Sequence, residues 1–214
     1  MKRRIKHVTV LGSGIMGSGI AAHFANIGVE VLLLDIVPFE LTEAEQKKGL
    51  TKEDKAVRNR IATESLAKLV KASPALLYKK EFAERISVGN FDDDLQKIKN
   101  TDWIIEVVVE RLDIKKSVYE KIEQFRKPGT LVSSNTSGIP INMLVEGRSD
   151  DFKKYFAGTH FFNPVRYLPL LEIIPTNDTD AEIVKFYMEY GAKFLGKTTV
   201  LAKDTPAFIA NRIG

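Results

Sequence analysis

The sequence predicts an α/β fold in which helices cover both faces of a doubly wound, mostly parallel sheet. Short apolar stretches alternate along the chain with helical patterns, as in βαβ units. Several stretches are apolar almost without interruption, as expected for parallel strands buried on both faces. The 214 residues, 44% hydrophobic and 28% charged, match one globular domain, alone or with an appendage.

The first βαβ unit carries a glycine motif, G-S-G-I-M-G, at residues 12–17. An apolar stretch at 8–11 precedes it, a helical segment follows it, and a second apolar stretch at 29–34 ends on Asp35. Three glycines alone would mark only a turn. The order of strand, glycine turn, helix, strand and acid is instead the fingerprint of a Rossmann-type dinucleotide site.

Each glycine of the motif has a physical role in this interpretation. Gly12 permits the tight turn out of the strand, Gly14 leaves room for a pyrophosphate, and Gly17 lets the helix pack closely on the strand. The helix start offers free N–H groups and a partial positive charge to the phosphates, so the predicted cofactor site includes Ile15 and Met16.

Asp35 predicts which dinucleotide binds. It lies 18 residues after Gly17, where a carboxylate accepts hydrogen bonds from an adenosine ribose. A carboxylate would repel the 2′-phosphate of NADP, and no arginine follows at 36–38. We therefore predict NAD as the cofactor.

Composition limits the other functions. The net charge of +4 is spread along the chain without interleaved aromatic residues, which makes a nucleic-acid surface a weak hypothesis. The chain has no cysteine, hence no disulfide, thiol nucleophile or cysteine metal site, and we expect no metal. These features fit a cytoplasmic enzyme.

The N-terminus superficially resembles a signal peptide, because Lys2, Arg3, Arg4 and Lys6 precede an apolar stretch. That stretch continues into the glycine motif, so we interpret the basic residues as a solvated approach to the first strand. No segment has the ~18 uninterrupted apolar residues of a membrane span.

Residues 36–85 interrupt the alternation of strands and helices after the second strand. Pro38 ends that strand, a helix is predicted over 56–71 with its start near Thr51, and 73–85 forms a further short helical piece. The helical insertion is either a solvated surface segment or an arm that contacts substrate.

The rest of the chain continues the βα pattern. We predict a helix over 91–99, a second that Asp113 caps and that runs to Phe125, a short one starting at 139–140, and one over 181–195. The remaining predicted strands cover 86–88, 102–110, 130–134, 155–161, 170–174 and 198–201.

Two polar residues stand out in the late strands. His160 is one of three histidines and follows Gly158-Thr159; imidazole suits acid–base work near neutral pH. Glu172 lies within an otherwise apolar strand, where a buried carboxylate needs a partner. They either form a catalytic pair or are, separately, a core histidine and a surface glutamate.

Five blocks together carry a resemblance. The segments I-I-E-V-V-V-E-R-L-D-I-K-K, S-N-T-S-G-I-P-I, G-T-H-F-F-N-P-V, P-L-L-E-I-I and K-D-T-P-A-F-I-A-N-R, in this order after the glycine fingerprint, resemble the 3-hydroxyacyl-CoA dehydrogenase family. The resemblance spans Gly12 to Arg212. It implies oxidation of (3S)-3-hydroxyacyl-CoA to 3-ketoacyl-CoA with NAD, in the β-oxidation pathway of fatty-acid and lipid metabolism.

The resemblance also implies a domain plan. Residues 1–205 would form the NAD-binding domain, with 36–85 as its arm, and 206–214 would begin a C-terminal helical domain. We expect this chain to be the cofactor domain of a longer, multifunctional enzyme that acts on acyl-CoA. The helical domain would be its partner, and a homodimer is expected only with that domain.

Site roles follow by position in the matching blocks. His160 corresponds to the catalytic base and Glu172 to the carboxylate that orients it. Ser137 matches a serine that contacts the substrate hydroxyl, and it is also counted with the cofactor site. Asn211 matches an asparagine that helps close the site. Positions that contact the cofactor in the family match Glu110, Lys115 and Asn163.

For the CoA part of the substrate, Ser65 matches a contact position in the arm. The family places a lysine seven residues beyond this serine, where this chain has Ala72. The neighbouring Lys71 is the candidate substitute.

Two alternatives from other classes stay open. The chain could be a non-catalytic NAD-binding module, against which the joint presence of His160, Glu172, Ser137 and Asn211 argues. It could instead be a dehydrogenase of a free 3-hydroxy acid, which would not respond to CoA as an inhibitor.

Overall fold

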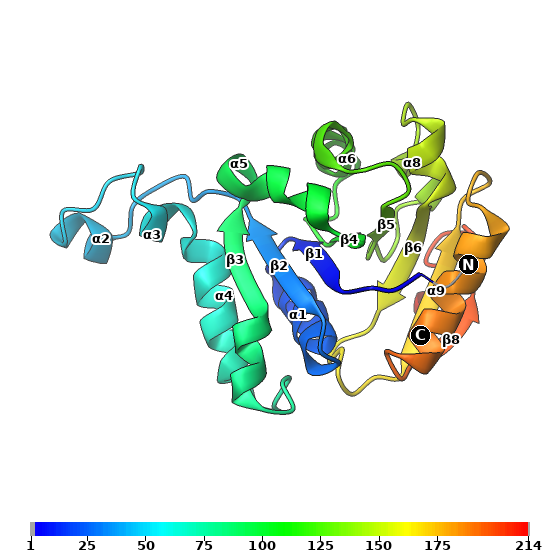
Figure 1. The fold of residues 1–214 in the computed structure, drawn as a ribbon, viewed down its shortest axis with the longest axis horizontal. Coiled ribbons are helices and arrows are strands. Elements are labelled where there is room, and N and C mark those ends of the chain that lie inside the picture. Colours follow the sequence, from blue (N-terminus) through cyan, green and yellow to red (C-terminus); the bar gives the residue numbers. More distant parts are fainter. Residues whose placement is uncertain (1–2, 214) are drawn as a thin grey trace.

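The computed structural model describes residues 3–213 and contains one eight-stranded sheet (Figure 1). The strand order is β3-β2-β1-β4-β5-β6-β7-β8, with β6 and β7 antiparallel and all other neighbours parallel. The strands are β1 (His7–Leu11), β2 (Glu30–Asp35), β3 (Ile86–Asn90), β4 (Trp103–Glu106), β5 (Leu131–Ser134), β6 (Phe156–Phe161), β7 (Leu170–Pro175) and β8 (Thr198–Leu201). The predicted Rossmann-type, doubly wound and mostly parallel sheet is confirmed.

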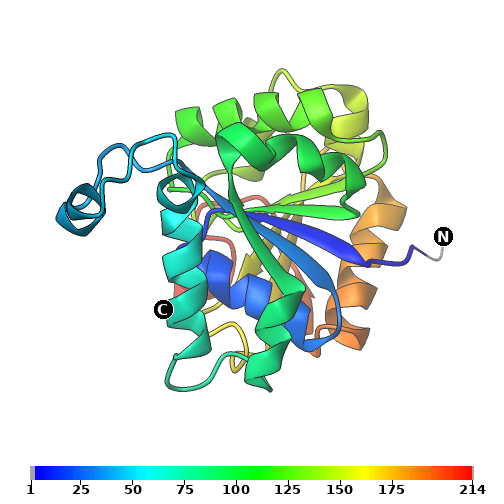
Figure 2. The ribbon, with the colours of Figure 1, turned by 60° about the vertical axis from the view of Figure 1, so that its left-hand side comes forward.

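Helices pack on both faces of this sheet. The α-helices are α1 (Ile15–Asn26), α2 (Glu43–Lys47), α3 (Lys55–Arg58), α4 (Arg60–Val70), α5 (Phe91–Asp94), α6 (Leu112–Phe125), α7 (Ile141–Leu144), α8 (Asp150–Lys154), α9 (Ala181–Lys193) and α10 (Ala210–Ile213). Two 3₁₀ helices, η1 (Lys80–Arg85) and η2 (Leu95–Asn100), complete the set. Figure 2 shows α1, α4 and α9 on one face and α5, α6 and α8 on the other.

The two faces hold separate hydrophobic cores. Trp103 and Ile105 of β4 belong to the core under α1 and α9, where Trp103 packs edge-on against Phe24. Ile104, between them in the sequence, belongs to the core under α6. This alternation is the period of two of a strand, and both of its faces are buried, as expected for a central parallel strand.

The helical insertion follows β2 as predicted, and α2 and α3 extend away from the body of the molecule (Figure 1). The predicted helix over 56–71 is divided at Asn59 into α3 and α4. The sequence analysis missed α2, which begins with a capping box: Thr42 accepts from the Glu45 amide, and the Glu45 carboxylate accepts from the Thr42 amide.

Four other predicted boundaries were wrong. Of the helical piece predicted over 73–85, only Lys80–Arg85 is helical, as η1. The predicted strand over 102–110 ends at Glu106, because the chain turns there and the Val108 amide donates to the Glu106 side chain. The helix predicted over 91–99 is a short α-helix, capped by Asn90, followed by η2. Asp113 lies in the first turn of α6 and does not cap it; Arg111 holds the cap position.

Among residues 3–213, the structure contains no helix long and apolar enough to cross a membrane.

Candidate active site

The carboxyl ends of β1 and β4, where the order of the strands reverses, open into two adjoining pockets. In sheets of this kind ligands bind at this switch point. The pockets measure about 480 and 790 Å³ and share Gly14, Val107 and Val108. Asp35 lines the larger pocket, and His160 lines the smaller one. Together they form a cleft with an acid at one end and a histidine at the other.

The smaller pocket brings most of the predicted site residues together. Those lining it are Gly14, Ile15, Met16, Gly17, Glu110, Lys115, Ser137, His160 and Asn163. They come from the glycine turn and the start of α1, the β4–α6 connection and the first turn of α6, the loop after β5, and the end of β6 with the loop that follows it. Because these segments are far apart in sequence, only the sheet order brings them into one site.

The glycine turn has the shape that its motif predicts. Gly12 has a φ of +106°, a conformation that glycine adopts without strain. A Cβ on Gly17 would collide with the Gly12 carbonyl oxygen, so glycine there allows α1 to pack on the turn. A Cβ on Gly14 would meet nothing within 4 Å, so the space in front of Gly14 stays open for a group such as a pyrophosphate. The turn therefore fits a dinucleotide.

Asp35 is held by the same turn. Its Oδ2 accepts hydrogen bonds of 2.6 Å from both the amide and the hydroxyl of Ser13, and its Oδ1 accepts from the Ile36 amide. The Ser13 hydroxyl also lies 3.1 Å from the hydroxyl of Ser65 on α4. The sequence analysis missed Ser13; its position between two motif glycines was the available signal.

The two predicted arm residues are separated. Ser65 lies beside the glycine turn through its contact with Ser13. Lys71 lies exposed just after α4 and lines neither pocket of the cleft.

His160 and Glu172 are hydrogen-bonded across β6 and β7. The His160 Nδ1 lies 2.7 Å from the Glu172 Oε2, and both side chains are buried. The other carboxylate oxygen of Glu172 accepts from the amides of Ile209 and Ala210. Because a carboxylate only accepts, Nδ1 carries a proton, and the tautomer of the neutral imidazole that fits this contact has its lone pair on Nε2.

The segment after Thr205 closes over this pair. Ala207 and Phe208 have φ values of 63° and 50°, a strained conformation for residues with a Cβ. The turn brings the buried Phe208 ring to 5.8 Å from the His160 ring and aims the next two amides at Glu172. Asn211 on α10 then donates to the Ser137 carbonyl oxygen over 3.4 Å.

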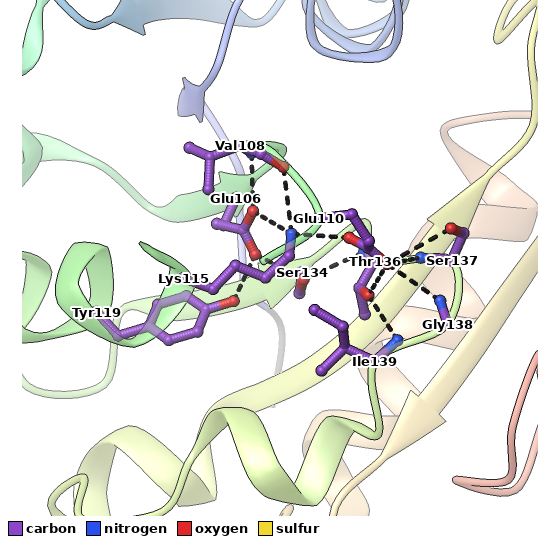
Figure 3. A network of polar contacts seen from close by, with 10 residues as sticks. All are labelled: Glu106, Val108, Glu110, Lys115, Tyr119, Ser134, Thr136, Ser137, Gly138 and Ile139. Carbon is purple, nitrogen blue, oxygen red and sulfur yellow. Dashed lines mark hydrogen bonds and ion pairs between the residues drawn. The ribbon is translucent and has the colours of Figure 1, made fainter. Parts of the chain in front are cut away.

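Ser137 lies in a loop fixed by Glu110. The Glu110 carboxylate accepts hydrogen bonds from the amides of Ser137 and Gly138 and from the Thr136 hydroxyl, and pairs with Lys115 at 3.2 Å (Figure 3). Partial burial acts to raise the pKa of Glu110, but these hydrogen bonds and the Lys115 charge leave it lowered. Glu110 is therefore ionised at neutral pH.

Behind Glu110 lies a buried residue that the sequence analysis did not select. Glu106, fully buried at the end of β4, accepts hydrogen bonds from Lys115, Tyr119, Ser134 and the Val108 amide, at 2.6–2.8 Å (Figure 3). The rule applied to Glu172, that a carboxylate in an apolar strand needs partners, would have found Glu106 as well.

A comparison with known families decides what this geometry belongs to. The family described as "3-hydroxyacyl-CoA dehydrogenase, NAD binding domain" matches residues 7–205. The chain belongs to the 3-hydroxyacyl-CoA dehydrogenase family. The resemblance found in the sequence is confirmed, and NAD is the cofactor of this family's domain, in agreement with the open glycine turn.

Named relatives of the 3-hydroxyacyl-CoA dehydrogenase family cover the whole chain. A probable 3-hydroxyacyl-CoA dehydrogenase of Bacillus subtilis is 57% identical over 214 residues, and one of Deinococcus radiodurans is 46% identical over 211. The two matches cover 100% and 99% of this chain. The chain, however, spans only 27% and 57% of the length of the two relatives.

Solved structures of the family have the same fold. The (S)-3-hydroxybutyryl-CoA dehydrogenase PaaH1 of Ralstonia eutropha is 30% identical, with a TM-score of 0.74 over 98% of this chain and 68% of that one. FadB2 of M. tuberculosis is 29% identical, with a TM-score of 0.76 over 99% of this chain and 68% of that one.

Proposed function

We propose that this chain is the cofactor domain of an enzyme that oxidises (3S)-3-hydroxyacyl-CoA to 3-ketoacyl-CoA with NAD. One observation carries the proposal: His160, hydrogen-bonded to Glu172, lines the same pocket as the glycine turn, which supports a base beside the reactive end of a dinucleotide. The names of the relatives support the substrate class.

His160 is the proposed base. While its Nδ1–H donates to Glu172, its Nε2 takes the proton of the substrate 3-hydroxyl. Glu172 stabilises the imidazolium that results and keeps the ring in this tautomer. A bound NAD would supply the acceptor for the hydride of the substrate carbon.

Ser137 and Asn211 are proposed to hold the substrate oxygen, since they meet at the mouth of the site. Binding of the cofactor is assigned to Gly12, Gly14, Ile15, Met16, Gly17, Asp35, Glu110, Lys115, Ser137 and Asn163. In the larger pocket, Asp35 would receive the ribose hydroxyls. We propose Ser65 as the CoA contact in the arm, with Lys71 as the candidate substitute for the lysine that the family places near it; neither residue lines the two pockets.

The domain plan is part of the proposal. Residues 1–205 form the cofactor domain, and 206–214 lead into a helical domain that completes the acyl pocket and the dimer interface. Two relatives with the name "putative fatty acid oxidation complex trifunctional enzyme" support a place in fatty-acid oxidation within a longer protein. We propose the cytoplasm as the location.

The test uses the full-length protein that carries this chain and follows NADH oxidation with acetoacetyl-CoA. His160→Gln should reduce turnover at least about 10³-fold, since a general base is lost, and leave NADH affinity nearly unchanged. The control is His7→Gln, because His7 is exposed at the start of β1. Normal turnover by the His160 variant would refute the base assignment, and equal rates with free acetoacetate would favour a free-acid dehydrogenase.

A further inference from the structure

Beside the pocket that holds His160 lies a cluster of three charged residues: Glu106 and Lys115, which are buried, and Glu110, whose side chain is 42% exposed (Figure 3). Lys115, with 1% of its side chain exposed, lies between the two carboxylates at 2.7 Å from Glu106 and 3.2 Å from Glu110. Lys115 and Glu110 line the pocket, and Glu106 lies behind them. The pair Lys115–Glu110 would by itself be neutral, so Glu106 decides the charge of the cluster.

The contacts of Glu106 support a negative charge. Its two oxygens receive the Val108 amide, the Lys115 ammonium and the hydroxyls of Tyr119 and Ser134. The amide and the ammonium only donate, and the ammonium pairs with Glu106 at 2.7 Å. Glu106 is therefore counted as a carboxylate.

The other two members are charged as well. Lys115 faces only acceptors, namely both carboxylates and the Val108 carbonyl oxygen. Glu110 accepts from two amides, from the Thr136 hydroxyl and from Lys115. Two carboxylates thus share one ammonium, and the cluster carries one net negative charge.

The other charges on or next to α6 lie near water. Asp113 pairs with Arg111, Lys116 pairs with Glu146, and the exposed Lys121 lines the larger pocket. Water screens these charges, whereas Glu106 and Lys115 are buried, so the charge of Glu106 acts over a longer distance.

We propose that the net negative charge of the Glu106–Lys115–Glu110 cluster raises the affinity of this site for the oxidised cofactor relative to the reduced one. The nicotinamide ring carries a positive charge in NAD⁺ and none in NADH. The inference rests on the proposed function, because the nicotinamide reaches this cluster only if it lies beside His160. Glu106 is then a specificity-determining residue that acts through Lys115 and Glu110 without touching the cofactor.

The test compares two dissociation constants, for NAD⁺ and for NADH, in the full-length protein without substrate. Glu106→Gln removes the charge but keeps an oxygen that accepts from Lys115 and Val108. Its NH₂ group can donate to the hydroxyls of Tyr119 and Ser134, which accept as well as donate. The dissociation constant for NADH divided by that for NAD⁺ should fall about 3- to 10-fold. Glu110→Gln removes the same charge from the same cluster and should lower the ratio in the same direction.

Tyr119→Phe is the matched control. It removes one hydrogen bond from Glu106 and changes no charge, so the ratio should stay at the wild-type value. A role of Glu106 in structure alone would weaken both cofactor forms equally in all three variants.

The outcomes separate the inference from the proposed function. If wild type binds both forms and the ratio is the same in Glu106→Gln, the inference is overturned and the proposed function stands. If Glu106→Gln does not fold, an unchanged ratio in Glu110→Gln overturns it. If wild type binds neither form, the proposed function fails and takes the inference with it.

Discussion

His160 on β6 and Glu172 on β7 stand directly opposite each other in the antiparallel register, with 2.7 Å between Nδ1 and Oε2. Facing residues of an antiparallel pair point to the same side of the sheet. The reversal of the chain between β6 and β7 therefore brings the carboxylate to the imidazole, although 12 positions separate them in sequence.

We predict that Glu172→Gln lowers kcat about 10²- to 10⁴-fold without weakening NADH binding. The amide oxygen would keep the bonds from Ile209 and Ala210, and the NH₂ would then face His160 and favour the tautomer in which Nε2 is protonated and cannot act as a base. Steady-state turnover and NADH titration measure the two effects. Glu189→Gln on α9, which removes an exposed ion pair with Lys193, serves as the control. It should change neither kcat nor the dissociation constant for NADH. Full activity of the Glu172 variant would contradict the orienting role.

Two alanine substitutions in the glycine turn should separate binding from stability. Gly14→Ala places a Cβ in open space and should lower NADH affinity at least about 10-fold, with little change in melting temperature. Gly17→Ala forces a Cβ onto the Gly12 carbonyl and should lower the melting temperature by several degrees. Thermal unfolding and cofactor titration of both variants give the comparison. Stable, tight-binding protein in both cases would contradict the assigned roles.

Asp35→Ala should weaken NADH binding about 10- to 100-fold, since hydrogen bonds to a charged group are lost. Ser13→Ala is the control, because it removes one bond to Asp35 and keeps the carboxylate; its effect should be much smaller. Fluorescence titration with NADH measures both. Equal affinities in wild type and Asp35→Ala would exclude the ribose contact.

His23 should make the protein less stable in acid. Burial and, next, the charge of Lys197 lower the pKa of His23 to about 4, against 6.5 when unfolded. The unfolded chain therefore binds more protons between these values, and up to about 3 kcal/mol of stability is lost as the pH falls from 6.5 to 4. The free energy of unfolding, measured across this pH range, should fall less in His23→Gln than in wild type.

The exposed His7 provides the control for this effect. His7→Gln should keep the wild-type acid dependence, because its imidazole is not buried. An acid dependence of His23→Gln equal to that of wild type would show that other groups cause the loss.

The sequence predicted some site features and missed others for a common reason. The fingerprint around Gly12 and Asp35 was readable because its parts follow each other within one βαβ unit. Glu106 was missed because its partners Lys115, Tyr119 and Ser134 lie on another helix and another strand. Hydrogen bonds between elements leave no periodic pattern in the sequence.

By itself, the sequence determined the alternation of strands and helices, the glycine turn and the residue types available for chemistry, since these depend on local patterns of apolar residues and on backbone freedom. The tertiary structure decided which of these residues meet. The antiparallel register joined His160 to Glu172, and the left-handed turn at Ala207 and Phe208 closed over that pair. The packing of α6 on β4 buried Glu106 against Lys115. Such contacts depend on the sheet order, which sets the side chains that are neighbours. They also depend on burial, because a buried charge without a partner destabilises the fold.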